Sequence, residues 1–370
     1  MFRRTQTRAL KIGNLALGGG APVSVQSMAN ADPHDAEALI AQVLSCARAG
    51  CDLMRLTVPD VDAAKVLAEV KKASPIPLVA DIHFDYRAAL AAIEFGADAL
   101  RLNPGNIGSR ANVQAVARAA KAKKIPIRIG VNGGSLEKGE TAVSSALKHL
   151  KMLEDEGFRD VVISAKLSDP VKTLETYRQL AELTDCPLHL GVTEAGGGSR
   201  GLLKSAVGIG ALLADGIGDT VRVSLAEAPE NEIPVAKELV EYVALRKNAP
   251  AIEGVAAEAF NYEEPVRRKT RAFGIIGGEN VPVVVGGEVH DENIAPDFVA
   301  GNTNILTLEN ADDDAFIAIE YSDLTPGNIA KIKSLKDIVL VASSQHINAV
   351  GELRALVHRL IAEGIEAPVI

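Results

Sequence analysis

The 370-residue sequence contains no tryptophan, and aromatic residues make up only 4% of it. Packing must therefore depend on aliphatic and small side chains, and the 47% hydrophobic content with 32 glycines suits a parallel α/β architecture. Cysteine is scarce too, because Cys46, Cys51 and Cys186 are the only three and form no C-x-x-C pair. Three cysteines make a poor disulfide framework, so we expect a reducing, cytoplasmic location.

Long apolar runs are also lacking. No stretch approaches the roughly 18 unbroken apolar residues of a membrane span. The N-terminal segment is basic but has no apolar core like that of a signal peptide. The net charge of −9 does not favour a nucleic-acid or anionic-membrane partner. We therefore expect neither kind of partner, and an anionic ligand would need a local cationic site.

Strand and helix patterns alternate along the first two thirds of the chain. Apolar segments predict eight strands, at 23–28, 53–57, 77–81, 99–102, 126–131, 160–164, 187–192 and 220–224. Helical periodicity lies between them, at 35–49, 60–73, 85–95, 109–123, 140–156, 171–184, 203–215 and 231–243. Eight such units predict a TIM (β/α)8 barrel over residues 1–245. A doubly wound open sheet is the alternative, but no G-x-G-x-x-G follows the first strand.

The pattern changes after the predicted barrel. Residues 246–265 lose the periodicity and are typical of a linker. Residues 266–370 predict a smaller, incomplete α/β domain with strands at 281–287, 304–310, 316–323 and 337–344 and helices at 326–335 and 349–363. The sequence stops at Pro368-Val369-Ile370, the start of an apolar strand, so we expect more of this domain in the intact protein.

Cations recur late in the apolar barrel strands: Arg55, Arg101, Arg128 and Arg222 lie between apolar residues, and Lys166 follows a fifth strand. A buried charge is costly unless it is paired or functional. Asp81 and Glu194 stand at equivalent strand ends and can neutralise only some of these cations. One interpretation is a structural ring of salt bridges. The other is a site for a diphosphate-sized anion at the C-terminal mouth, where active sites of this fold lie.

Other polar residues also stand at predicted strand ends. A glycine run at 196–198 followed by Ser199 can expose backbone N–H groups at a helix start, although most such runs are only flexible loops. His83 lies two residues from Asp81 and could transfer protons or bind a metal, but no third ligand is evident, so we predict no metal site. The remaining residues of this kind are Gln26, Ser27, Met28, Asn103, Asn106, Asn132, His189 and Thr193.

Seven strings in one order resemble a single enzyme family: VQSMAN, MRLTVP, VADIHFD, RLNPGNIG, IRIGVNGGSLEK, LHLGVTEAG and KSAVGIGALLADGIGDTVRVSL. The family is that of the 4-hydroxy-3-methylbut-2-enyl diphosphate synthases of the methylerythritol phosphate route to isoprenoids. The resemblance covers essentially all of residues 1–245. It implies an oxidoreductase that opens the ring of 2-C-methyl-erythritol 2,4-cyclodiphosphate with two electrons, which a [4Fe–4S] cluster and a flavodoxin or ferredoxin supply.

The resemblance also implies roles for individual residues. Contacts to the diphosphate are expected from Arg55, Arg101, Arg128, Lys166 and Ser224, and the cation pattern adds Arg222. Asp81, His83, Asn132 and Glu194 are expected in the pocket, with Asp81, His83 and Glu194 as catalytic candidates and Glu194 as the candidate for proton transfer. A homodimer is one expected assembly.

The sequence departs from the family pattern in two places. The segment after GVNGGSLEK is short, which puts part of a lid over the pocket in doubt. No cysteine follows Cys186, so the three cysteines and one glutamate that hold the family's cluster have no counterpart. Residues 266–370 instead resemble the start of the spacer domain of the family's long form. We therefore expect this chain to need a cluster-bearing domain or chain and to be inactive alone.

Two alternatives remain open at this point. One is a paralogue without a cluster that binds a phosphorylated metabolite, and the other is a pteroate-synthase-like transferase, whose barrel also binds a diphosphate ester. No pterin-type motif is recognisable, which favours the synthase over the transferase.

Overall fold

The computed structural model describes residues 5–136, 138–193, 195–245, 249–254, 266–286, 295–299 and 303–370. The chain divides into two compact units, Phe2–Lys247 and Asn248–Ile370. Among the described residues, no helix combines the length and the hydropathy needed to cross a bilayer.

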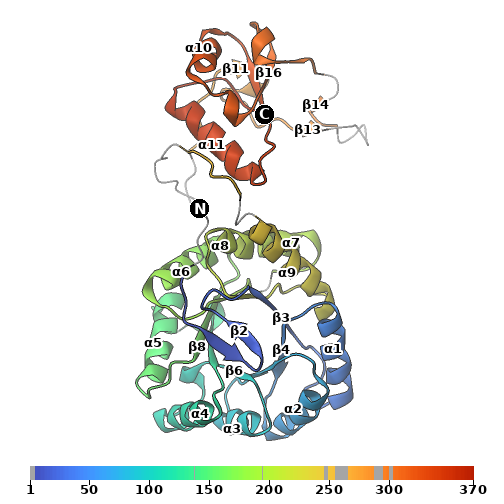
Figure 1. Cartoon of the computed structure of the whole chain (residues 1–370), viewed down its shortest axis with the longest axis vertical. Coiled ribbons are helices and arrows are strands. Elements are labelled where there is room, and N and C mark those ends of the chain that lie inside the picture. The colour runs from blue at the N-terminus through green and yellow to red at the C-terminus, as the bar shows by residue number, and fades with distance from the viewer. Residues whose placement is uncertain are drawn as a thin grey trace. The chain divides into compact units, whose positions relative to one another are not determined.

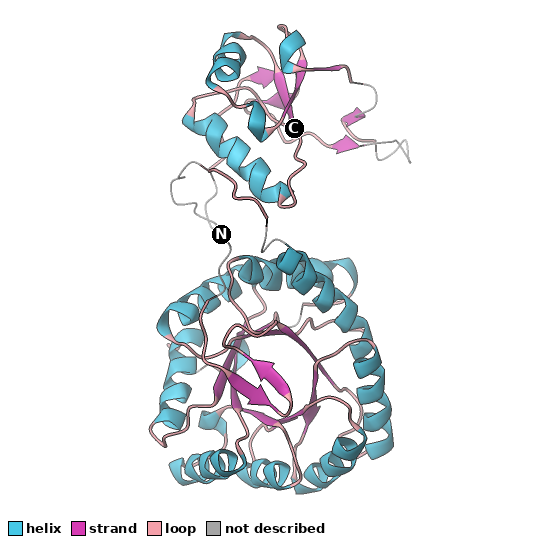
Figure 2. Ribbon diagram, viewed as in Figure 1, coloured by secondary structure: helices cyan, strands magenta, loops and turns pink. Residues whose placement is uncertain are grey.

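The first unit is a barrel of parallel strands surrounded by helices (Figure 2). Its eight-stranded sheet has the order β8-β7-β6-β5-β4-β3-β10-β9, and a bridge between Ile163 and Leu188 joins the two ends of that order. The predicted TIM barrel is therefore confirmed. The strands are β3 (Ser24–Met28), β4 (Leu53–Thr57), β5 (Leu78–Asp81), β6 (Ala99–Leu102), β7 (Ile127–Asn132), β8 (Val161–Lys166), β9 (His189–Leu190) and β10 (Thr220–Val221).

Helices follow the strands around the ring (Figure 1). They are α1 (Ala36–Arg48), α2 (Val61–Ala73), α3 (Tyr86–Glu94), α4 (Arg110–Lys123), α5 (Ala142–Glu154), α6 (Pro170–Leu183), α7 (Gly198–Ser205), α8 (Ala211–Ala214) and α9 (Pro229–Ala244). A π-helical turn, η3 (Ala206–Gly210), joins α7 to α8, and 3-10 turns η1 (Pro104–Asn106) and η2 (Gly133–Ser135) follow β6 and β7. Aspartates cap several helices by accepting backbone N–H bonds, as Asp35 does from Ala38 and Asp60 from Ala63.

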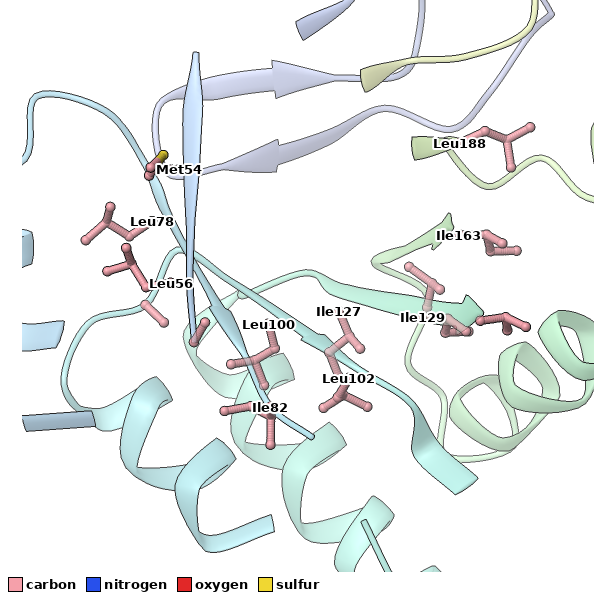
Figure 3. Close-up of a cluster of buried hydrophobic side chains, with 14 of the residues drawn as sticks. Met54, Leu56, Leu78, Ile82, Leu100, Leu102, Ile127, Ile129, Ile163 and Leu188 are labelled. Atoms are coloured by element: carbon pink, nitrogen blue, oxygen red, sulfur yellow. The ribbon is translucent and has the colours of Figure 1, made fainter. Parts of the chain in front are cut away.

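Strand residues alternate between the helix layer and the barrel interior, because successive side chains of a strand point to opposite faces. Met54 and Leu56 of β4 pack outward with Leu100 and Leu102 of β6 in the core between strands and helices (Figure 3). Arg55 and Arg101 lie between these residues in sequence and therefore point into the barrel. The same pleat that builds the apolar core brings the cations together inside.

A hairpin of β1 (Leu10–Ile12) and β2 (Leu15–Leu17) precedes the barrel and was not predicted from the sequence. Ile12 and Leu17 are 4% and 0% exposed and pack with residues at the beginnings of barrel strands, namely Leu53, Val79, Ala99 and Val162. The hairpin thus closes the end of the barrel where the strands begin, and it crosses the centre of the ring in Figure 2.

The second unit contains small sheets and two helices. A parallel sheet orders β15 (Ile305–Leu306), β16 (Phe316–Ile319) and β17 (Val339–Ala342), and Leu340 of β17 also bridges to Val369. Helices α10 (Pro326–Ser334) and α11 (Ala349–Ala362) contribute Ile332, Leu356 and Leu360 to its core. Four two-residue strands pair beside it: β11 (Ala272–Phe273), β12 (Ile276–Gly277), β13 (Val285–Gly286) and β14 (Phe298–Val299). Turns η7 (Leu308–Asn310) and η8 (Tyr321–Asp323) complete it. Most of the predicted linker, at 246–248 and 255–265, lies outside the described residues.

Candidate active site

A pocket of about 180 Å³ lies at the ends of the barrel strands. Eight of the ten predicted site residues line it: Arg55, Asp81, His83, Arg101, Asn132, Lys166, Arg222 and Ser224. They come from six strand ends. Met28, Ser164, Val192 and Thr193 complete the lining. The pocket lining therefore combines four cations with one carboxylate and several other side chains.

Asp81 holds two of the four cations. Its carboxylate lies 3.4 Å from Nε of Arg55 and 3.1 Å from Nη1 of Arg101, and its side chain is only 2% exposed. Burial alone would raise the pKa of Asp81. Arg55, a hydrogen bond with His83 and Arg101 outweigh burial and hold that pKa well below its usual range. Asp81 is therefore a permanent anion that fixes two guanidinium groups at the mouth.

A second buried carboxylate, which sequence reasoning missed, holds Arg222. Glu232 lies in the first turn of α9, and its Oε2 is 3.4 Å from Nε of Arg222. Glu232 also accepts hydrogen bonds from the Ser27 hydroxyl at 3.1 Å and from the Leu225 backbone N–H at 3.0 Å. A glutamate in the first turn of a helix usually faces solvent. The only signal that the sequence offered for Glu232 was its position shortly after a predicted barrel strand.

Two glycines make room for the charged side chains. A Cβ at Gly130 would lie 2.1 Å from Nε of Arg101, and a Cβ at Gly191 would lie 2.7 Å from Nζ of Lys166. Any larger residue would push these cations out of place. The Arg101 guanidinium also donates a hydrogen bond to the Gly130 carbonyl at 3.0 Å. The strands are thus shaped around the cations.

Lys166 is the most enclosed cation that lines the pocket, at 8% exposure. Burial first, and then the charges of Arg55, Arg222, Arg128 and Arg101, lower the pKa of Lys166 well below its usual value. No described carboxylate lies within ion-pair distance of it. An arriving anion would therefore supply the counter-charge that Lys166 lacks.

Arg128 does not line the pocket. It is 5% exposed and points into the barrel interior, where its Nη1 donates to Oε1 of Gln26 at 2.8 Å, while Nε and Nη2 have no hydrogen-bond partner among the described residues. His189 is fully buried nearby, with its Nδ1 3.4 Å from Oγ1 of Thr220, and burial followed by the charge of Arg128 lowers its pKa well below the usual value. Glu194 lies outside the described residues.

The position of Arg128 in its strand does not by itself explain this placement. Arg128 is the second residue of β7 and Asn132 is the last. Side chains that face the same way recur every second residue, so Arg128, Gly130 and Asn132 form three successive levels. Of these three, Asn132 lines the pocket. Arg128 is paired in register with Arg101 of β6, but the Arg128 side chain bonds Gln26 whereas that of Arg101 bonds Asp81.

The fold and the pocket define a TIM-barrel protein with a cation-rich pocket at the ends of its strands. The GcpE TIM-barrel domain family matches residues 7–237. A Lawsonia intracellularis protein named 4-hydroxy-3-methylbut-2-en-1-yl diphosphate synthase (flavodoxin) is 52% identical over 259 residues, which are 67% of this chain and 72% of that protein. A Geobacter sulfurreducens protein of the same name is 50% identical over 254 residues, 66% of this chain and 72% of its own length.

The chain belongs to this family of 4-hydroxy-3-methylbut-2-en-1-yl diphosphate synthases, oxidoreductases of isoprenoid biosynthesis. Dihydropteroate synthase of Yersinia pestis has a similar structure, with a TM-score of 0.50 and 14% identity over 65% of this chain and 99% of that one. That likeness is one of fold alone, so the transferase alternative has no support beyond a shared barrel.

The iron–sulfur cluster implied by the family does not fit the cysteines of this chain. Cys51 and Cys186 precede β4 and β9, at the barrel end opposite the pocket, and Cys46 lies in the last turn of α1. Cluster ligation needs several thiolates that converge on one point. All three thiols are buried, and burial raises the pKa of Cys46 to about 11 and that of Cys51 to about 12. No group of three or more metal-binding side chains occurs among the described residues.

Proposed function

We propose that the barrel mouth binds 2-C-methyl-erythritol 2,4-cyclodiphosphate and that this chain supplies the substrate-binding half of its reductive conversion to 4-hydroxy-3-methylbut-2-enyl diphosphate. The observation that carries the proposal is the pocket itself. Arg55, Arg101, Lys166 and Arg222 surround one cavity, and Asp81 is the single carboxylate among its described lining residues.

The charge balance of the mouth favours a ligand with more than one negative group. Asp81 pairs with Arg55 and Arg101, and Glu232 pairs with Arg222, so among the residues that the structure describes two carboxylates face four cations. A structural ring of salt bridges would be expected to neutralise itself, because an unpaired buried charge is costly. The excess of positive charge instead suits the two phosphate groups of the cyclic substrate, which arginines can contact in bidentate fashion.

The pocket residues orient this substrate and control its protons. Arg55 and Arg101 are held in fixed directions by Asp81, so little conformational freedom is lost when a phosphate binds. His83 Nε2 lies 3.5 Å from Oδ2 of Asp81, and its side chain is 45% exposed, so it can exchange a proton with solvent. Asn132 and Ser224 add neutral hydrogen-bonding groups at the rim. The proposed role of Glu194 in proton transfer rests on the family resemblance.

Removal of the ring oxygen takes two electrons, and the cysteines described above do not fit a cluster that could deliver them. We therefore propose that a cluster-bearing domain or chain completes the site and that flavodoxin, which the relatives' names specify, is the electron donor, with ferredoxin as an alternative. Residues 266–370 would act as part of a spacer domain, with 246–265 as the linker to the barrel. A homodimer and a cytoplasmic location stay predictions.

Two measurements on the full chain test the proposal. Calorimetric titration should show binding of the cyclodiphosphate, and anaerobic assays with reduced flavodoxin should show no turnover by the chain alone. Addition of the cluster domain of a long-form relative should produce activity. Turnover by the chain alone, after removal of any host synthase, would contradict the proposed division of labour. Binding that is never followed by turnover would favour the paralogue that only binds a phosphorylated metabolite.

A further inference from the structure

Glu232 is a buried acid beside an anion site, where a negative charge is electrostatically unfavourable for the ligand. It is 3% exposed and belongs to α9, outside the strands that carry the other charged groups. Its negative charge also acts on Arg55 across the mouth. A carboxylate in this place weakens the attraction for an anion, so its presence calls for a compensating role.

The hydrogen bonds of Glu232 bring together three segments, of which one is its own helix α9. Oε2 accepts the Ser27 hydroxyl from β3 and faces Nε of Arg222, while Oε1 accepts the Leu225 N–H, which follows Ser224 directly. Ser27 also donates to the Pro229 carbonyl at the start of α9, at 3.3 Å. One carboxylate therefore links the end of β3, the segment after β10 and the first turn of α9.

Arg222 depends on the Glu232 carboxylate because its neighbours in the pocket are also cations. It lies near two other cations, Arg55 and Lys166, whose pKa values its charge lowers. Among the described residues, Glu232 is the only carboxylate within ion-pair distance of Arg222. The other contact that the Arg222 guanidinium makes in the pocket is weak, with its Nη1 lying 3.5 Å from the Met28 sulfur.

We propose that Glu232 is a positioning residue that holds Arg222 and the Ser224–Leu225 backbone in the arrangement that faces the ligand. This inference rests on the proposed function of the mouth, and it assigns to α9 a part in substrate binding. Glu232 acts through Arg222 and Ser224 and does not contact the ligand.

The sign of one measurement separates positioning from charge. Removing a carboxylate makes the mouth more positive, so a pure charge effect would tighten anion binding. Loss of positioning would weaken it, because Arg222, the Leu225 N–H and the Ser27 hydroxyl would lose their shared partner. For Glu232→Ala we expect the affinity for inorganic pyrophosphate to fall roughly tenfold or more, as for loss of a charge-assisted contact. Glu232→Gln keeps an acceptor oxygen and should fall between Ala and the parent chain.

The matched control is Glu230→Gln, which removes the same charge from the same turn of α9, but from a partly exposed residue that makes no hydrogen bond or ion pair with the described pocket residues. It should leave binding within about twofold, as expected for an exposed charge. In an Arg222→Ala background, Glu232→Ala should cost little further affinity, because the residue it positions is gone.

The outcomes are distinct. Tighter or unchanged pyrophosphate binding by a folded Glu232→Ala or Glu232→Gln chain would overturn the positioning role while leaving the proposed function intact. If Glu232→Ala does not fold, Glu232→Gln still decides, measured both in the parent chain and in the Arg222→Ala background. Failure of the parent chain to bind either pyrophosphate or the cyclodiphosphate would overturn the proposed function and this inference together.

Discussion

The two ends of the barrel have opposite chemistry although the same strands build both. At the strand beginnings, Leu53, Val79, Ala99 and Val162 meet the hairpin in an apolar cluster. At the strand ends, Arg55, Asp81, Arg101 and Lys166 surround a polar pocket. Leu53 and Arg55 are two residues apart on β4, so successive side chains on the same face of the strand belong to the apolar cluster and to the charged pocket. The apolar end stabilises the barrel and the polar end is the proposed binding site, which is the usual division in this fold.

The largest effect should come from the closed end. Leu17 is fully buried in the hairpin, and Leu17→Ala should destabilise the barrel by about 3 kcal/mol, as for other buried leucines. Anion affinity should not change, because the cavity that Leu17→Ala leaves lies at the opposite end of the strands from the pocket. Urea unfolding with calorimetric titration measures both quantities. Leu183→Ala, at a residue that is 59% exposed, is the matched control and should change neither. A large loss of affinity in Leu17→Ala would show that the two ends are not independent.

The open end should give the converse result. Arg101→Ala removes a bidentate donor and should weaken pyrophosphate binding roughly ten- to a hundredfold. Stability should fall less than in Leu17→Ala, although Asp81 would retain only Arg55 as an arginine partner. Lys11→Ala removes an exposed cation from the hairpin and should leave binding unchanged. Equal, small effects of both changes in titration would support a structural ring in place of a ligand site.

Arg128 sharpens the comparison, since it lies between the two ends. The family resemblance predicts that Arg128→Ala loses most ligand binding, whereas its position below the pocket lining suggests a contribution to the barrel interior through Gln26. Thermal unfolding and pyrophosphate titration of Arg128→Ala would separate these roles. Binding lost with little change in melting temperature would support the predicted contact.

Much of this arrangement could be predicted from the sequence, because strand periodicity and the positions of cations within strands are local properties. The predicted strands at 53–57 and 99–102 coincide with β4 and β6, and the M-R-L and L-R-L patterns place Arg55 and Arg101 inside the barrel. The partner that each side chain finds was not predictable, because Arg101 and Arg128 are paired in register and yet bond Asp81 and Gln26, respectively. Arg128 therefore appeared equivalent to Arg101, although only Arg101 lines the pocket.

Contacts between distant segments were the other gap. Glu232 meets Ser27 across more than 200 positions, and the hairpin meets strand beginnings spread over the whole barrel. Neither contact leaves a periodic pattern. A short strand such as β1, with three residues, is also too brief to stand out from its surroundings.

A smaller effect should come from the glycine that accommodates Arg101. Gly130→Ala places a methyl group where the Arg101 guanidinium lies, so binding should weaken by about tenfold as that contact is displaced. Gly134→Ala, four residues further on, meets nothing within 4 Å and is the control. In the Arg101→Ala background, Gly130→Ala should have little further effect on titration. If the losses of binding free energy from Gly130→Ala and Arg101→Ala add in full in the double variant, Gly130 acts on something other than Arg101.

The smallest effect concerns the protonation of Lys166. Burial and the surrounding arginines lower the pKa of Lys166 well below its usual value, so its neutral form is favoured more than that of an exposed lysine. A bound diphosphate favours the charged amine and raises that pKa, so binding takes up a proton. Affinity should therefore be highest at low pH and fall as pH rises from the lowered pKa of the free chain toward the raised pKa of the complex, by at most about tenfold per pH unit.

Calorimetric titration in buffers of different ionisation enthalpy measures directly how many protons are taken up when the ligand binds. Pyrophosphate titrates as well, so the informative quantity is the difference between the parent chain and Lys166→Met, which keeps the length of the side chain but cannot take up a proton. If both chains take up the same number of protons, Lys166 is already charged before the ligand arrives, and the open end of the barrel is a preformed cationic site.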